Sequence, residues 1–139
     1  MGMELPSAIS HDARHAEECL DFDGAPGCIA EAREAAAAFL RHHSPPARST
    51  FHDDVLLVVS ELVTNAVRHA PGPFALELGL VPGGIGITVR DTSSRPPHSR
   101  TPDRTGGRGW GIVQALARRV RVVPRHDGDG KAVHAELNW

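Results

Sequence analysis

The spacing of the apolar residues changes within residues 51–91, which read FHDDVLLVVSELVTNAVRHAPGPFALELGLVPGGIGITVRD. Over residues 51–70 it follows the period of a helix, and Pro71-Gly72-Pro73 ends that helix. Apolar residues then alternate with other residues over 74–80 and again over 85–89, which is typical of strands with one buried face. The segment therefore predicts a long helix followed by a β-hairpin.

The flanking sequence predicts the remaining elements. Thr50-x-x-Asp53 favours an N-terminal cap for the long helix. We expect a strand over 15–22, a helix over 28–41, a loop over 92–105, a helix ending at Ala117, and strands around 120–122 and 133–139. These elements predict an α+β fold, a two-layer α/β sandwich whose mixed, mostly antiparallel sheet is covered on one face by helices.

Size and composition are those of one globular domain. The chain has 139 residues, of which 40% are hydrophobic and 23% are charged. We expect a flexible N-terminus over 1–14 and a single domain over 15–139. No apolar run reaches the roughly 18 residues of a membrane span, and no signal peptide is evident, so we expect a cytoplasmic protein. The two cysteines cannot form a disulfide framework, and His11 and His15 make a weak metal motif.

Charge is distributed unevenly along the chain. Residues 1–80 carry a balance of −7, whereas residues 81–139 carry +5, and five arginines fall within 90–108. This arginine-rich stretch is either a solvated loop or an electropositive rim for a polyanionic ligand. The chain has no Tyr, four Phe and two Trp, so an aromatic platform for nucleic acid is not expected.

Three polar residues recur along one face of the long helix. Glu61, Asn65 and His69 are spaced i, i+4 and i+8. They are either the solvent-exposed stripe of an amphipathic helix or side chains that face a pocket. In a pocket, Asn65 offers a neutral oxygen suited to Mg²⁺, and Glu61 offers a general base.

Two further features have the same ambiguity. Asp91 ends a strand on the face of Ile85, Ile87 and Val89, so it either caps a turn or accepts the exocyclic amine of a bound base. The glycine-rich run 106–111 precedes a helix, where backbone N–H groups favour phosphate. It is not a Walker loop, because Gly-Lys-Ser/Thr is missing.

Taken together, these motifs resemble a known ATPase superfamily. Glu61 to Ala70 resembles the N box shared by gyrase, histidine kinases, mismatch-repair proteins and a heat-shock chaperone. Val89-Arg90-Asp91-Thr92-Ser93 resembles the first glycine box, and residues 107–113 the second. The E-x-x-x-N-x-x-x-H spacing, with Thr64 before Asn65, is similar to that of anti-sigma-factor serine kinases.

The resemblance implies an ATP site between the helical layer and the sheet. It implies that Glu61 is the catalytic base, that Asn65 ligates Mg²⁺, and that residues 92–106 form a lid. The nucleotide-binding residues that it implies are Asn65, His69, Asp91, Ser93, Gly107, Arg108, Gly109 and Gly111. The first glycine box lacks its usual glycines, and Ala132 replaces the usual Thr of the last strand, which predicts a stiffer lid and a lower nucleotide affinity.

The function that the resemblance implies is an ATP-binding anti-sigma factor and serine/threonine kinase. Such a protein sequesters a sigma factor and phosphorylates an antagonist protein, with ATP and Mg²⁺ as cofactors and without contacting nucleic acid or membrane. A homodimer is left open. The alternative is a non-enzymatic switch that sequesters its partner and binds ATP weakly or not at all. A detached histidine-kinase domain would need a phosphoacceptor His on a dimerisation helix, which the sequence does not offer.

Overall fold

The computed structural model describes residues 17–43, 50–70, 72–93, 109–125 and 130–139. Three helices and five strands form in the described part. In chain order they are β1 (Glu17–Phe22), α2 (Cys28–His43), α3 (Phe51–His69), β2 (Phe74–Val81), β3 (Gly84–Asp91), α4 (Gly109–Leu116), β4 (Arg119–Pro124) and β5 (Lys131–Asn138). The predicted elements are all present, and their order is that of an α+β fold.

The strands form one sheet in the order β1-β2-β3-β5-β4, and every described pairing is antiparallel. β2 and β3 form the predicted hairpin, in which Val81 pairs with Gly84. β5 lies next to β3 in a register that pairs Asp91 with Lys131 and Val89 with Val133. The last residue of β3 is therefore opposite the first residue of β5.

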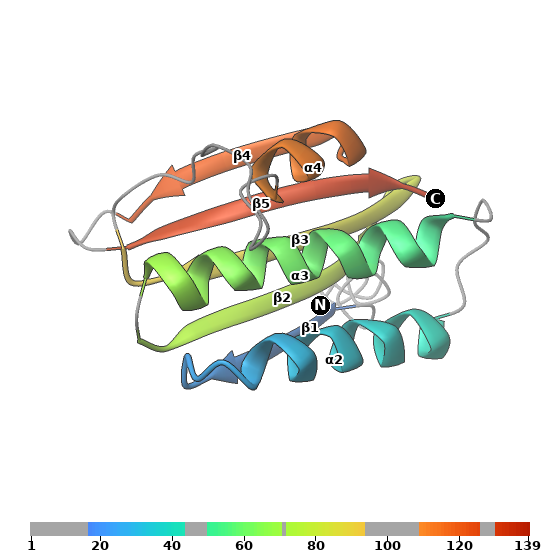
Figure 1. Ribbon diagram of the computed structural model, residues 1–139. Helices are drawn as coiled ribbons and strands as arrows, with labels where there is room; N and C mark the ends of the chain where they lie inside the picture. The colour runs from blue at the N-terminus through green and yellow to red at the C-terminus, as the bar shows by residue number, and fades with distance from the viewer. Residues whose placement is uncertain (1–16, 44–49, 71, 94–108, 126–129) are drawn as a thin grey trace, which may run out of the picture.

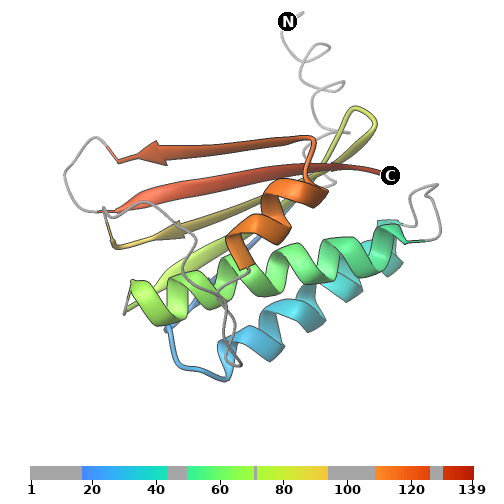
Figure 2. The same ribbon diagram turned by 45° about the horizontal axis from the view of Figure 1, so that its top comes forward.

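The helices α2, α3 and α4 lie on the same side of the sheet, which gives the molecule two layers (Figures 1 and 2). The core fills the space between the layers. α3 contributes the largest helical share, because seven of its residues are buried: Phe51, Val55, Val58, Val59, Leu62, Val63 and Ala66. They meet the alternating apolar residues of the central strands, including Leu76, Ile87 and Leu137, each of which is essentially inaccessible to solvent.

Two details differ from the sequence-based expectations. α2 continues to His43 rather than ending at Arg41. Thr50 is the N-cap residue of α3, as predicted, but it has helical dihedral angles and its side chain makes no cap hydrogen bond. Its hydroxyl instead lies 3.4 Å from Asp54 Oδ2, one turn into the helix, because helical dihedrals at Thr50 direct its side chain away from the first free N–H groups.

No helix in the described ranges is both long and apolar enough to cross a membrane.

Candidate functional site

The polar line on α3 is part of the helix that covers the sheet. Glu61 and Asn65 are half-buried, and His69, the last residue of the helix, is exposed. The line is therefore not a simple solvent-exposed stripe, since its first two members are partly enclosed. Asn65 Nδ2 is fully buried and has no hydrogen-bond partner among the described residues. A buried amide without a partner is costly, so it marks a position that a ligand is able to satisfy.

Glu61 contacts the first turn of α4. A Cβ added to Gly109 would overlap Glu61 Oε1 and would lie 3.1 Å from its Cδ. Only glycine at this position lets the carboxylate approach the helix so closely. The N-terminus of a helix carries a partial positive charge, which favours an adjacent carboxylate. The structure thus brings together two predicted site residues that lie in separate motifs.

Asp91 faces the helical layer from the end of β3, where its buried side chain forms an ion pair with Lys131. Only 4% of Asp91 and 6% of Lys131 is exposed. Lys131 Nζ lies 3.1 Å from Asp91 Oδ1 and 2.9 Å from Oδ2, and the backbone N–H of Ser93 donates to Oδ1 at 3.0 Å. Lys131 Nζ also donates to the carbonyl oxygen of Ser93 at 3.2 Å. Asp91 and Ser93, both predicted site residues, are therefore joined by a lysine that the sequence reasoning missed.

Gly130 allows Lys131 to reach this position. It has a φ of +114°, which favours glycine, and a Cβ there would lie 2.6 Å from the carbonyl oxygen of Asp91. The tight approach sets the start of β5 directly against the end of β3. One sequence signal pointed to Lys131: it is the single lysine of a chain that has fourteen arginines.

The remaining predicted residues divide into two groups. Gly111 lies on α4 two residues after Gly109, and a Cβ added there would meet nothing within 4 Å. Gly107 and Arg108 lie outside the described residues, as does the expected lid apart from Thr92 and Ser93. Their roles remain predictions from the sequence.

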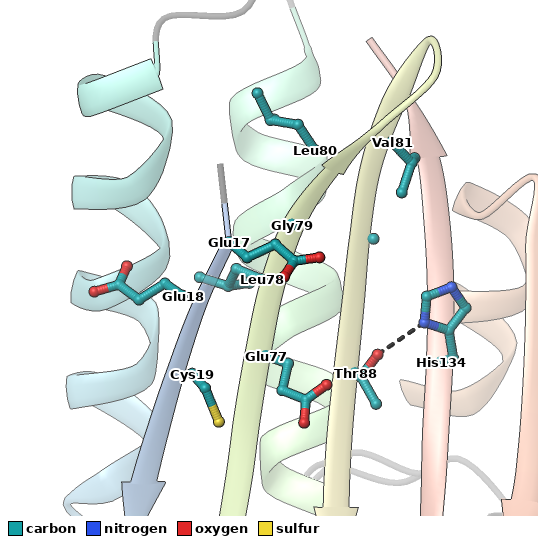
Figure 3. Close-up of a pocket in the computed structure, with 11 residues that line it drawn as sticks. Glu17, Glu18, Cys19, Glu77, Leu78, Gly79, Leu80, Val81, Thr88 and His134 are labelled. Carbon is teal, nitrogen blue, oxygen red and sulfur yellow. Dashed lines mark hydrogen bonds between the residues drawn. The ribbon is translucent and has the colours of Figure 1, made fainter. Parts of the chain in front are cut away.

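A separate hollow of about 650 Å³ lies on the opposite face of the sheet (Figure 3). It forms where Gly79 and Gly86 pair across β2 and β3 and leave no side chains to fill the surface. Beside it, Thr88 Oγ1 is hydrogen-bonded to His134 Nδ1 at 2.8 Å, and His134 Nε2 lies 3.0 Å from Glu136 Oε2. The hydrogen bond from His134 lowers the pKa of Glu136 below its ordinary value. Of the predicted nucleotide-site residues that the structure describes, none lines this hollow.

The helix-facing residues offer carboxylate and amide groups to a ligand between the layers. The carboxylate of Asp91 accepts from the ammonium of Lys131 and from the backbone N–H of Ser93, so an incoming amine would have to replace one of these donors. Asn65 Nδ2 on the facing helix is an unpaired N–H donor that an acceptor oxygen of a ligand would satisfy, and the amide oxygen of the same side chain is a separate group of the kind that Mg²⁺ takes as a ligand. In the ranges that the structure describes, no three His, Cys, Asp or Glu side chains cluster as a metal site. Mg²⁺ characteristically takes few protein ligands and uses substrate phosphates for the rest.

Comparisons with known proteins indicate the family and the fold of the chain. The model of the histidine kinase-like ATPase domain family matches residues 22–137. The chain is 29% identical over 119 residues to an anti-sigma F factor of Pasteuria penetrans, covering 74% of this chain and 77% of that protein. It superposes with a TM-score of 0.65 on the crystal structure of the RsbU and RsbW domains of Rv1364c from Mycobacterium tuberculosis. That match covers 88% of this chain at 16% identity, and the chain spans 31% of that longer protein.

Proposed function

Because the chain belongs to the histidine kinase-like ATPase domain family, we propose that it is a cytoplasmic ATP-binding anti-sigma factor. Its partner in this role is a sigma factor, which it sequesters. Its catalytic activity is that of a serine/threonine kinase, which phosphorylates an antagonist protein to release the sigma factor. The similarity to an anti-sigma F factor over most of both chains supports this role.

The observation that carries the proposal is the placement of polar side chains on both layers of the sandwich. Glu61 and Asn65 lie half-buried on α3, and Asp91 lies buried on the face of β3 that α3 covers. Most of the space between the layers is apolar, so the buried ion pair of Asp91 with Lys131 and the unpaired N–H group of Asn65 are costly to keep there. A ligand that binds these polar groups would explain why the chain keeps them despite that cost.

Each residue has a distinct proposed role. Asp91 accepts a hydrogen bond from the amine of the adenine base, and Asn65 holds Mg²⁺ through its amide oxygen. Glu61, one turn before Asn65, accepts the proton of the Ser or Thr hydroxyl of the antagonist. When bound, Mg-ATP supplies the phosphoryl group. Phosphoryl transfer depends mainly on positioning and charge neutralisation, so this small set of residues is sufficient equipment.

A Glu61→Ala variant tests the kinase assignment. A general base contributes about 10²–10⁴-fold to rate, so transfer of radiolabelled phosphate to the antagonist should fall by that factor. Binding of Mg-ATP, measured by calorimetry, should survive, because Glu61 does not hold the nucleotide in this scheme. The matched control is Glu34→Ala on the exposed face of α2, which should alter neither quantity. Equal transfer rates for wild type and Glu61→Ala would contradict the role of Glu61 as base.

The non-enzymatic switch remains the second candidate, and two contacts favour it. Lys131 occupies the carboxylate of Asp91, and the carboxylate of Glu61 is turned against Gly109. Both groups are thus engaged within the chain. Copurification of partners with and without Mg-ATP separates the candidates: a protein that retains a sigma factor but transfers no phosphate to any copurifying antagonist is the switch.

A further inference from the structure

The ion pair between Asp91 and Lys131 is a closed set of hydrogen bonds. Lys131 has three N–H donors, and three acceptors lie within reach: the two carboxylate oxygens of Asp91 and the carbonyl oxygen of Ser93. Both side chains are more than nine-tenths buried, so water does not weaken the pair. The ammonium is therefore fully satisfied where it lies.

These hydrogen bonds compete with the amine of the nucleotide base for the carboxylate of Asp91. The amine of a purine base is a neutral donor, whereas the ammonium of Lys131 makes charge-assisted hydrogen bonds to the same carboxylate, and these are about twice as strong. Both oxygens of Asp91 already accept from Lys131, and Oδ1 also accepts from the backbone of Ser93. A base that approaches Asp91 meets an acceptor whose charge is neutralised and whose space is filled.

We propose that Lys131 is a resident competitor of the nucleotide base at Asp91, so that release of this lysine limits nucleotide binding. The inference rests on the proposed ATP-binding function and adds the residue that sets its affinity. In the resting protein the ε-ammonium stands where the exocyclic amine would lie. Binding of the base opens the Asp91–Lys131 pair and exchanges one amine for the other.

The unusual use of lysine in this chain agrees with a specific role. Apart from the histidines, the fourteen other basic residues are all arginines, whose planar guanidinium carries five donors. Lys131 is a compact cation that fits within the turn made by Asp91 and Ser93. Its flexible four-carbon stem lets the charge move away without moving the backbone of β5.

The first test is calorimetry with Mg-ATP on Lys131→Thr. Removing the competitor should lower the Kd at least about tenfold, which corresponds to about 1.4 kcal/mol. The matched control is Arg90→Thr, which makes the same change in charge one residue before Asp91, but on the other face of the sheet, where Arg90 pairs with Glu77 at 2.7 Å. Adding Asp91→Asn to Lys131→Thr should abolish the gain, since the gain acts through that carboxylate.

The second test uses the wild-type protein and so does not depend on the variant's folding. Because the chain has one lysine, growth with ¹³C,¹⁵N-lysine gives a single side-chain NMR signal set. Saturating Mg-ATP should shift the Nζ and Cε signals toward those of a solvent-exposed lysine. Unchanged signals in a protein that calorimetry shows to be saturated would overturn the inference and leave ATP binding intact.

The calorimetric results also distinguish a failure of the inference about Lys131 from a failure of the proposed ATP binding. ATP binding by Lys131→Thr alone, or tighter binding by it than by wild type, supports the inference. Binding by wild type that is equal to or tighter than that of Lys131→Thr overturns it, while the proposed function stands. If neither protein binds Mg-ATP at millimolar concentration, the proposed ATP binding fails, and the inference fails with it.

Discussion

At the scale of single residues, Gly109 leaves room for the carboxylate of Glu61 against the first turn of α4. A Cβ at Gly109 would overlap the carboxylate, whereas a Cβ at Gly111, two residues further along α4, meets nothing within 4 Å. The atom that the Cβ would meet is the flexible end of a half-buried side chain, so we expect Gly109→Ala to displace the carboxylate of Glu61 and to leave the free energy of unfolding lower than Gly111→Ala does, by up to about 1 kcal/mol. Gly111→Ala should raise it by up to about 1 kcal/mol, because alanine favours helix. Chemical denaturation of both variants measures the difference.

The double variant Glu61→Ala/Gly109→Ala assigns the cause. Removing the carboxylate removes the overlap, so the second alanine should then be tolerated as well as alanine at Gly111. If Gly109→Ala alone is as stable as Gly111→Ala, the side chain of Glu61 moves aside freely, and the contact does not hold it in place.

At the scale of secondary-structure elements, β5 contributes side chains to both faces of the sheet. Val133, Ala135 and Leu137 point into the core in line with Lys131, whereas His134 and Glu136 point to the opposite face. There Glu136 accepts from His134 and also pairs with Arg118 at 3.3 Å. These contacts stabilise the charged carboxylate and lower the pKa of Glu136 in the folded state.

A lowered carboxyl pKa makes folding stability depend on pH in a definite direction. The contribution of Glu136 is present above the ordinary pKa of glutamate, about 4.3, and is lost as pH falls through the lower folded-state value. Glu136→Gln should therefore be less stable than wild type at pH 7, and the gap should narrow as the pH is lowered below about 4. Urea unfolding across this range measures it, with the exposed Glu34→Gln as control. A gap that stays constant with pH would show that the charge of Glu136 does not matter.

The elements were largely predictable from sequence, because their signals are local. Alternation over residues 74–91 defined β2 and β3, and the polar line of Glu61 and Asn65 followed from helical spacing alone. The contacts between motifs were not predictable in this way. Asp91 and Lys131 are 40 residues apart, and their pairing depends on β5 inserting between β3 and β4. The contact of Glu61 with Gly109 depends likewise on how α4 packs against α3.

At the scale of the whole molecule, the two-layer arrangement places unsatisfied polar groups where a ligand between the layers would stabilise the fold. α3 holds two buried polar atoms without partners among the described residues, Ser60 Oγ and Asn65 Nδ2. Only Asn65 belongs to the line that includes Glu61. If a ligand supplies an acceptor oxygen to Asn65 Nδ2, the cost of this unpaired donor is offset only in the liganded protein. A ligand that binds only the folded state adds about 2.7 kcal/mol at 100 times its Kd.

Asn65→Ala should therefore separate folding from binding. We expect the unliganded variant to gain about 1 kcal/mol in its free energy of unfolding, since it loses a buried amide that has no partner. Mg-ATP should raise the Tm of the wild type but not that of Asn65→Ala, and EDTA should remove the wild-type shift. Ser60→Ala is the control: it removes the other unsatisfied atom on α3, so it should gain stability in the same way and keep its full response to Mg-ATP. An equal Mg-ATP response in Asn65→Ala and Ser60→Ala would mean that Asn65 does not hold the metal.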